Sequence, residues 1–160
     1  MNKKYRVGFT ASSFDLLHTG HIIMLEECKT VCDKLVVAFN ASPVSKDNVQ
    51  TIEERYRQLA AVKYVDEIIS YHTEDEMLDI LRTTNPDVRF LGDDYRNRTD
   101  FTGSELNIPI FFNNRTHGYS TSELKERTAF KSNTLKSIIK ALDDNKDIDV
   151  IRDIVSASKK

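Results

Sequence analysis

Residues 5–40, YRVGFTASSFDLLHTGHIIMLEECKTVCDKLVVAFN, contain two strand-like runs on either side of a helix pattern. Residues 5–11 predict a strand, and a polar loop separates them from a helix expected at about 20–33. Residues 34–40 form a nearly continuous apolar run, as expected for a parallel strand that is covered on both faces. The stretch therefore predicts two parallel strands joined by a helix in a right-handed crossover.

The same alternation continues toward the C-terminus. Further helices are expected near 51–64 and 73–84, and further strands at 66–71, 87–92 and 108–112. Both helices begin with a capping-box signature, Thr51 with Glu54 and Thr73 with Glu76. About five strands alternating with helices predict an α/β fold, a Rossmann-like doubly wound parallel sheet.

Composition and charge narrow the function classes. The 160 residues include 23 basic and 25 acidic side chains, and a formal charge of −2 argues against a general binder of nucleic acids or anionic membranes. No apolar run approaches the length of a membrane-spanning helix, and residues 1–7, MNKKYRV, lead into the first strand without the apolar core of a signal peptide. We therefore expect a cytoplasmic protein that neither binds nucleic acid nor inserts into a membrane.

The sequence contains two cysteines, Cys28 and Cys32, four residues apart on the first predicted helix. No second pair of cysteines or histidines completes a tetrahedral metal site with them. Their spacing favours two small apolar residues on the core-facing side of that helix.

The pattern changes after Lys131, where residues 132–160 predict two short amphipathic helices. The first of them carries its apolar residues along one stripe: Leu135, Ile138, Ile139 and Leu142. Since a solvated tail would not carry such a stripe, we expect this extension to pack on the core or on a partner chain. The expected organisation is a domain at residues 1–131 and a helical C-terminal extension at 132–160.

The familiar phosphate-binding loops are missing from the sequence. It contains neither G-x-x-x-x-G-K-[ST] nor a G-x-G-x-x-G after the first strand, and five glycines in total cannot supply a glycine-rich cradle. If the protein binds phosphates, it must use helix N-termini and side chains.

His18 and His21 stand where such a site would form. In an open parallel sheet, ligands bind beyond the carboxyl ends of the strands, and these residues follow the first strand. We expect Thr19 to cap the following helix, so that both imidazoles lean over its positive N-terminus and donate hydrogen bonds to a phosphoryl group. Two alternatives stay open. His18 could be an ordinary loop residue and His21 an exposed helix residue, or the two could belong to a zinc site, for which no third ligand is evident.

A second candidate anion site lies at residues 115–123. Ser120 and Glu123 form another capping box at the start of a helix, so Ser120 could serve only as a cap. Capping and phosphate binding are compatible, however. The hydroxyls of Ser120 and Thr121, with Arg115 just upstream, would suit an anion at this helix N-terminus.

Together these segments resemble a known family. F-D-L-L-H-T-G-H at 14–21, directly after a strand, resembles the H-x-G-H signature of the nucleotidylyltransferase superfamily. R-T-H-G-Y-S-T at 115–121 resembles the R-T-x-G-x-S-T segment of the cytidylyltransferase branch, especially the glycerol-3-phosphate cytidylyltransferases. YVDEII at 64–69 and GDD at 92–94 are also similar, and the resemblance covers about residues 5–128.

The resemblance implies an enzyme that transfers CMP from CTP to a small phosphorylated alcohol and releases pyrophosphate. Glycerol 3-phosphate, which would give CDP-glycerol, is the leading acceptor. The resemblance further implies Mg²⁺ as cofactor and a homodimer. Two alternatives stay open: an adenylyltransferase of the same superfamily acting on a sugar phosphate or another phosphorylated acceptor, and an inactive nucleotide-binding module that docks a partner.

The resemblance also implies roles for individual residues. The catalytic residues would be His18, His21 and Arg115. The nucleotide would contact Ser13, Phe14, Asp15, Lys46, Asp94, Arg115, Thr116, Ser120 and Thr121. The acceptor would contact Arg55 and Lys63, and Asp15 would help position the magnesium ion through water.

Several of these residues have ordinary alternatives when taken alone. Arg55 could be a solvated or salt-bridging residue, Lys46 ordinary loop charge, and Asp94 a turn residue. Two departures from the family pattern bear on the substrates. Ser12 and Ser13 replace a glycine–threonine pair, and Lys63 replaces an arginine, so that a point charge stands in place of a bidentate fork.

Overall fold

The computed structural model describes residues 3–42, 48–114, 118–143 and 148–157. Its strands are β1 (Tyr5–Ser12), β2 (Cys32–Asn40), β3 (Glu67–Tyr71), β4 (Val88–Gly92) and β5 (Ile110–Asn113). Its α-helices are α1 (Thr19–Val31), α2 (Ile52–Ala60), α3 (Glu74–Thr84), α4 (Thr121–Asp143) and α5 (Ile148–Ala157). Two short 3₁₀ turns, η1 (Asp93–Tyr95) and η2 (Ser104–Leu106), lie between β4 and β5.

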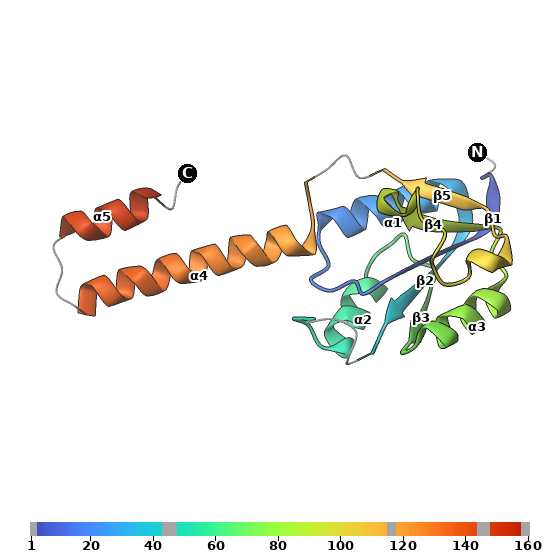
Figure 1. Ribbon diagram of the computed structural model, residues 1–160, viewed down its shortest axis with the longest axis horizontal. Helices are drawn as coiled ribbons and strands as arrows, with labels where there is room; N and C mark the ends of the chain where they lie inside the picture. Colours follow the sequence, from blue (N-terminus) through green and yellow to red (C-terminus); the bar gives the residue numbers. More distant parts are fainter. Residues whose placement is uncertain (1–2, 43–47, 115–117, 144–147, 158–160) are drawn as a thin grey trace. The chain divides into compact units, whose positions relative to one another are not determined.

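The five strands form one parallel sheet in the order β3-β2-β1-β4-β5 (Figure 1). This confirms the predicted doubly wound α/β fold. The chain moves outward from β1 in one direction through β2 and β3, then returns to the other side of β1 for β4 and β5. The carboxyl ends of β1 and β4 are therefore neighbours, at the point where a doubly wound sheet binds its ligand.

Alternating side chains of β2 divide the core into two layers. Leu35, Val37 and Phe39 pack with residues of α1 and α2, such as Leu25 and Leu59. Val36 and Ala38 face the other way and pack with Met77 and Leu81 of α3. A strand buried on both faces explains the continuous apolar run in the sequence.

The strand and helix bounds differ from the expected ones by a few residues. β2 begins at Cys32 rather than at residue 34, because α1 ends at Val31 and the backbone of Cys32 is already extended. Cys28 and Cys32 are both fully buried, as predicted for core residues. Burial raises the pKa of both thiols, so both stay protonated and unreactive at neutral pH.

Residues Tyr119–Lys160 form a compact unit of their own, separate from Met1–Gly118. The expected boundary after residue 131 lies inside α4, which runs without a break from Thr121 to Asp143. The prediction of a new helix at 132 is wrong, since residues 121–143 contain neither proline nor glycine to end the helix.

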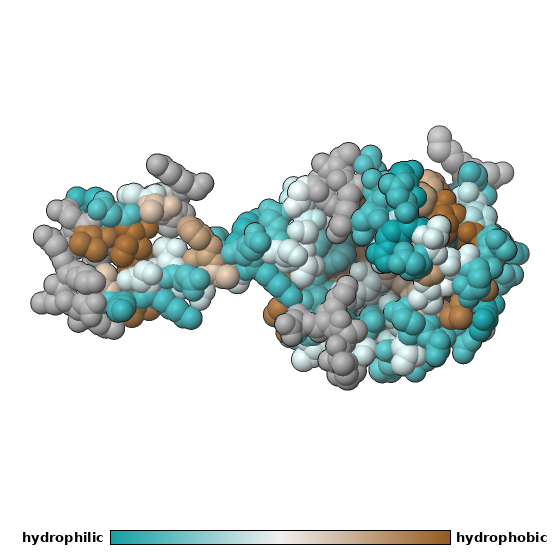
Figure 2. All heavy atoms as spheres, in the orientation of Figure 1, coloured by the Kyte–Doolittle hydropathy of each residue, from teal (hydrophilic) through white to brown (hydrophobic). Residues whose placement is uncertain are grey.

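α4 and α5 lie side by side in this second unit (Figure 1). Ala141 is buried, whereas Leu135, Ile139 and Leu142 of the predicted stripe are 58%, 49% and 59% exposed. Figure 2 shows apolar residues gathered on this helix pair. In the described ranges, none of the helices combines the length and hydropathy that a membrane crossing requires.

Candidate active site

The loop between β1 and α1 lies at the carboxyl edge of the sheet; His18 stands at its end and His21 in the first turn of α1, and residues 13–21 are called the histidine loop below. His18, rather than the expected Thr19, is the N-cap of α1. Its backbone is extended, and the amide of Gly20 donates to His18 Nδ1 at 3.1 Å. The prediction that Thr19 caps the helix is wrong, because Thr19 already has a helical position and an imidazole nitrogen takes the place of its hydroxyl.

The two imidazole rings are stacked. Their centroids are 3.9 Å apart with an interplanar angle of 23°. The amide of His18 donates to Nδ1 of His21 at 3.4 Å, so each Nδ1 accepts from a backbone amide. A nitrogen that accepts such a bond carries no proton, and in the neutral rings the proton therefore sits on Nε2. Local backbone bonds thus make Nε2–H the hydrogen-bond donor of both rings.

The same loop contains strained backbone. Phe14 and Leu16 have φ values of 50° and 49°, in the left-handed region of backbone conformation that β-branched or bulky residues rarely adopt. Each such residue costs about 1–3 kcal/mol, which surrounding contacts must offset. Phe14 is fully buried beside the His21 ring, and the amide of Leu16 donates to Oε1 of Gln50 at 2.7 Å. Strain held in this way is typical of functional loops.

Asp15 connects this loop to the turn before α2. Its carboxylate accepts from the amide of Val49 at 3.0 and 3.1 Å and from the amide of Gln50 at 2.9 Å. The residue is only 2% exposed. The carboxylate is thereby fixed between two segments that lie 34 residues apart in sequence.

Arg55 joins the ends of two strands from inside the protein. Its Nη1 donates to the carbonyl oxygens of Ser13 at 2.8 Å and Asn40 at 2.7 Å, and its guanidinium carbon lies 5.6 Å from the centre of the Phe39 ring. Burial lowers its pKa, while the nearby Asp15 opposes the shift. Arg55 is only 2% exposed, so the alternative interpretation of a solvated surface arginine is wrong. Its predicted contact with the acceptor stays a prediction.

The remaining predicted residues are dispersed. Asp94 is exposed and follows β4 in η1, at the same edge of the sheet as the histidines. Lys63 lies in the turn between α2 and β3, where β3 begins, and therefore at the opposite edge. The structure does not bring Lys63 next to the histidine loop within one chain. Lys46, Arg115 and Thr116 lie outside the described residues.

Ser120 and Thr121 belong to the second unit. Ser120 Oγ accepts from the amide of Glu123 at 3.1 Å, which confirms its capping role at the N-terminus of α4. Whether it also binds a phosphate stays a prediction.

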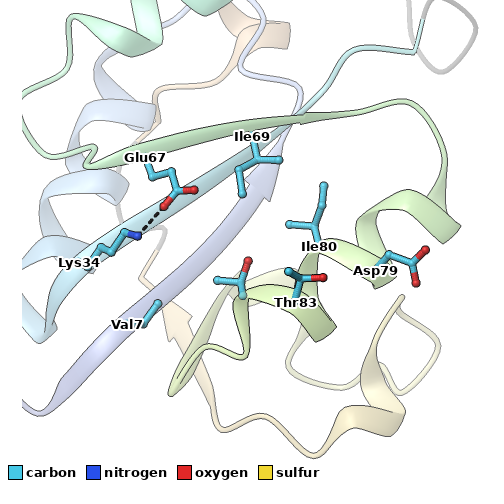
Figure 3. A pocket seen from close by; sticks show the side chains of 8 residues that line it. Val7, Lys34, Glu67, Ile69, Asp79, Ile80 and Thr83 are labelled. Atoms are coloured by element: carbon cyan, nitrogen blue, oxygen red, sulfur yellow. Dashed lines mark ion pairs between the residues drawn. The ribbon is translucent and has the colours of Figure 1, made fainter.

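A cavity of about 530 Å³ lies between α3 and the face of the sheet formed by β1, β2 and β3 (Figure 3). Val7, Ile69 and Ile80 form apolar parts of its wall. The charged groups of Lys34 and Glu67 in this wall pair with each other at 2.5 Å. Among the predicted site residues that the structure describes, none lines this cavity.

The sequence-based interpretation missed three polar residues at the carboxyl edge. Gln50 and Asn40 appeared as ordinary loop and strand-end residues, yet the side chain of Gln50 accepts from the amide of Leu16 and the backbone carbonyl of Asn40 accepts from Arg55. Asn113, at the end of β5, is 4% exposed and donates to Oε2 of Glu27 on α1 at 2.8 Å. An asparagine at the end of an apolar strand was the available signal for Asn113, whereas a backbone carbonyl such as that of Asn40 leaves none.

Comparisons with known proteins identify a matching family model and similar sequences. A family model described as cytidylyltransferase-like matches residues 9–127. Glycerol-3-phosphate cytidylyltransferase of Bacillus subtilis is 34% identical over 124 residues, covering 75% of this chain and 95% of that protein. Bifunctional protein HldE of Gluconacetobacter diazotrophicus is 39% identical over 97 residues, or 57% of this chain, and this match spans 20% of that protein's length.

A solved structure has the same fold. The lipopolysaccharide core biosynthesis protein from Thermoplasma volcanium superposes with a TM-score of 0.59 at 24% identity. The superposition covers 71% of this chain and 99% of that chain.

Proposed function

Because the chain belongs to the cytidylyltransferase-like family, we propose that it transfers CMP from CTP to a small phosphorylated alcohol, with glycerol 3-phosphate as the leading acceptor. The observation that carries this proposal is the stacked pair of imidazoles at the N-terminus of α1, whose Nδ1 atoms both accept backbone amides. Two Nε2–H donors beside a positive helix end suit a phosphoryl group that gains charge during reaction.

The proposed reaction needs little proton transfer. A phosphate oxygen of the acceptor, ionised at neutral pH, attacks the α-phosphorus of CTP. The bond from that phosphorus to the bridging oxygen of the β-phosphate breaks, and pyrophosphate leaves. Catalysis of such a step rests on alignment and on stabilisation of charge.

In this proposal His18 and His21 donate to the α-phosphate oxygens as their charge rises. Arg115, Ser120 and Thr121 would hold the β- and γ-phosphates, with Lys46 as a further phosphate contact. Ser13 would line the nucleotide site next to the histidines, and Asp94 would contact ribose or base. Phe14, also predicted to contact the nucleotide, is fully buried and would act by supporting the His21 ring. The capping hydroxyl of Ser120 supports its place at an anion site, because helix N-termini bind anions.

Mg²⁺ is part of the proposal as an ion that the triphosphate brings with it. The carboxylate of Asp15 already accepts from the amides of Val49 and Gln50. The residues therefore fit a magnesium ion that is bound by phosphate oxygens and water rather than directly by Asp15. Across the described part of the chain, no group of three or more His, Cys, Asp or Glu side chains is arranged to hold a metal. We assign no step of the reaction to the ion, and the indirect role of Asp15 stays a prediction.

We propose further that the protein is a homodimer. The support is the apolar stripe of α4, where Leu135, Ile139 and Leu142 are about half exposed or more. Surfaces of this kind are typical of protein contacts.

The nucleotide and the acceptor are tested together by pyrophosphate release. CTP and ATP are each offered with glycerol 3-phosphate and with a panel of sugar phosphates. Release with CTP and glycerol 3-phosphate is the expected result. A second candidate, an adenylyltransferase acting on a sugar phosphate, stays open because a differently named relative, HldE, matches at 39% identity. Release with ATP alone would favour it, and no release with any pair would favour the inactive binding module.

A further inference from the structure

The connection between β4 and β5 has little regular structure of its own. Residues 93–109, all of which the structure describes, contain two short 3₁₀ turns, Asp93–Tyr95 and Ser104–Leu106. Such a segment is placed by individual contacts with the rest of the protein rather than by a ladder of backbone bonds. Several of these contacts converge on one side chain, that of Arg89.

Arg89 is a charged residue inside the sheet. It lies in β4 between Val88 and Phe90, whose side chains join the core beneath α1 and α2. Its own side chain therefore points to the face that α3 covers, where it is 4% exposed. Burial lowers the pKa of Arg89, and the nearby Tyr95 and Glu74 oppose the shift. An apolar side chain could often replace such a charge without loss of stability, so its partners indicate its purpose.

These partners belong to the connection. Nη1 of Arg89 donates to the carbonyl oxygen of Thr102, and the guanidinium carbon lies 5.3 Å from the centre of the Phe101 ring. Phe101 in turn meets the ring of Tyr95 edge-on, with 6.2 Å between the centroids. One guanidinium therefore contacts the middle of the connection and, through Phe101, its beginning at η1.

Two further features hold the same stretch against α3. Oγ1 of Thr102 donates to Oε2 of Glu74, the first residue of α3. Gly103 follows with a φ of 79°, and a Cβ there would lie 3.2 Å from Nη1 of Arg89 and 2.7 Å from Cδ1 of Leu81. The positive φ favours glycine, and a Cβ would also displace the ends of the Leu81 and Arg89 side chains. The backbone thus approaches Arg89 as closely as a residue without a side chain allows.

The beginning of the connection carries a predicted nucleotide contact. Asp94 follows β4, which pairs with β1 in parallel, so the connection leaves the sheet next to the histidine loop. A Cβ at Gly92 would lie 2.3 Å from Oδ1 of Asp94, so that glycine makes room for the carboxylate. Asp94 is therefore held by the end of β4 on one side and by the rest of the connection on the other.

We propose that Arg89 is a positioning residue for the nucleotide: by holding Phe101 and Thr102 it keeps the connection, and with it Asp94, at the carboxyl edge of the sheet. This inference rests on the proposed function, in which Asp94 contacts ribose or base. It assigns Arg89 no contact with either substrate.

The test compares Arg89→Met and Arg89→Lys with Arg82→Met, which removes an exposed arginine of α3 that pairs with Asp79. Amide hydrogen exchange of residues 93–107 is measured without ligand, followed by kcat and the KM values for CTP and the acceptor. In both Arg89 variants we expect exchange of this segment to rise about tenfold and KM for CTP to rise about tenfold. We expect kcat to change less than about threefold, because the lost interaction binds ground and transition states alike. Arg82→Met should match the wild type.

Phe101→Leu covers the case in which the Arg89 variants do not fold, since it weakens the same contact from the connection's side and leaves the buried charge in place. It should raise KM for CTP in the same direction. Wild-type activity with unchanged KM for CTP in the Arg89 or Phe101 variants would overturn this inference and leave the proposed function standing. A rise in exchange without a rise in KM would overturn it equally. A wild-type protein that neither binds nor converts nucleotide would instead overturn the proposed function, and this inference with it.

Discussion

His18 caps the N-terminus of α1, because its Nδ1 accepts a hydrogen bond from the amide of Gly20 at 3.1 Å. The same bond leaves the proton of the neutral ring on Nε2, where the proposed reaction requires a donor. His21 reaches the same state through the amide of His18. The spacing of three residues therefore has a structural reason as well as a chemical one. In the capping box the backbone amide of each histidine donates to the ring of the other, which helps to determine which nitrogen of that ring carries the proton.

Replacing His18 by Asn separates these two tasks. Asparagine is as good an N-cap as any residue, so the free energy of unfolding should stay within about 0.5 kcal/mol of the wild type. It lacks the imidazole donor, so kcat should fall about 100- to 1,000-fold. His18→Ala should show the same loss of kcat and a further loss of about 1 kcal/mol in stability. Denaturant unfolding and pyrophosphate release measure the two effects.

Wild-type turnover in His18→Asn would contradict the proposal, because it would show that the imidazole ring of His18 takes no part in the reaction. His21→Ala provides an independent check on the pair, and its kcat should fall about as far as that of the His18 variants.

At the scale of elements, the loop before α1 is tied to the beginning of α2. Asp15 accepts from the amides of Val49 and Gln50, and the side chain of Gln50 accepts from the amide of Leu16. Arg55 of α2 reaches back to the carbonyl of Ser13. These bonds offset the strained backbone of the loop and give the histidines a fixed support.

Asp15→Asn tests this support against the predicted metal role. The variant keeps one acceptor oxygen but brings a donor amide against backbone amides, so stability should fall by about 1–3 kcal/mol. The Mg²⁺ concentration for half-maximal activity should rise only slightly, because both carboxylate oxygens already accept backbone amides and the predicted role of Asp15 toward the ion acts through water. Asp33→Asn, at an exposed residue of β2, is the matched control. A tenfold shift in the Mg²⁺ requirement without loss of stability would place Asp15 on the metal instead.

At the scale of the whole molecule, the chain divides into a unit that carries the sheet and the histidine loop and a helical hairpin. The family model matches residues 9–127, so most of α4 and all of α5 lie beyond it. The hairpin buries Ala141 but leaves Leu135, Ile139 and Leu142 exposed along one stripe at spacings of four and three. Two packed helices alone bury too little apolar surface for much stability, which is why we expect a second copy to cover this stripe.

Sedimentation measures the oligomeric state directly and so tests the expected dimer. The wild-type chain of 18.4 kDa should sediment as a dimer, and a double variant, Leu135→Glu with Ile139→Glu, should shift it toward the monomer. Asn133→Glu with Ser137→Glu adds the same charge at the same spacing, at two exposed residues away from the stripe, and should stay dimeric. A wild-type monomer at micromolar concentration, or a double variant that dimerises as well as its control, would contradict the homodimer formed through α4.

Local interactions explain what could be derived from the sequence alone. The alternation of strands and helices, the capping box of Thr51 with Glu54 and the cap of α3 by Thr73 all depend on residues within a few positions of each other, and the structure confirms them. The fold followed from the same local pattern, because strands joined by helices pack in few ways. The motif at residues 14–21 indicated the family, and the family model agrees.

Tertiary structure decided what depends on distant residues. Asp15 meets Val49 across 34 positions and Arg55 meets Ser13 across 42, and neither contact leaves a trace in local spacing. Arg55 and Lys63 lie only eight positions apart, but Arg55 reaches the histidine loop from α2, whereas Lys63 lies in the turn that leads into β3 and therefore at the opposite edge. A sequence shows which side chains are available nearby, but the pairing of distant strands determines which of them share an edge, and a binding site is built from that edge.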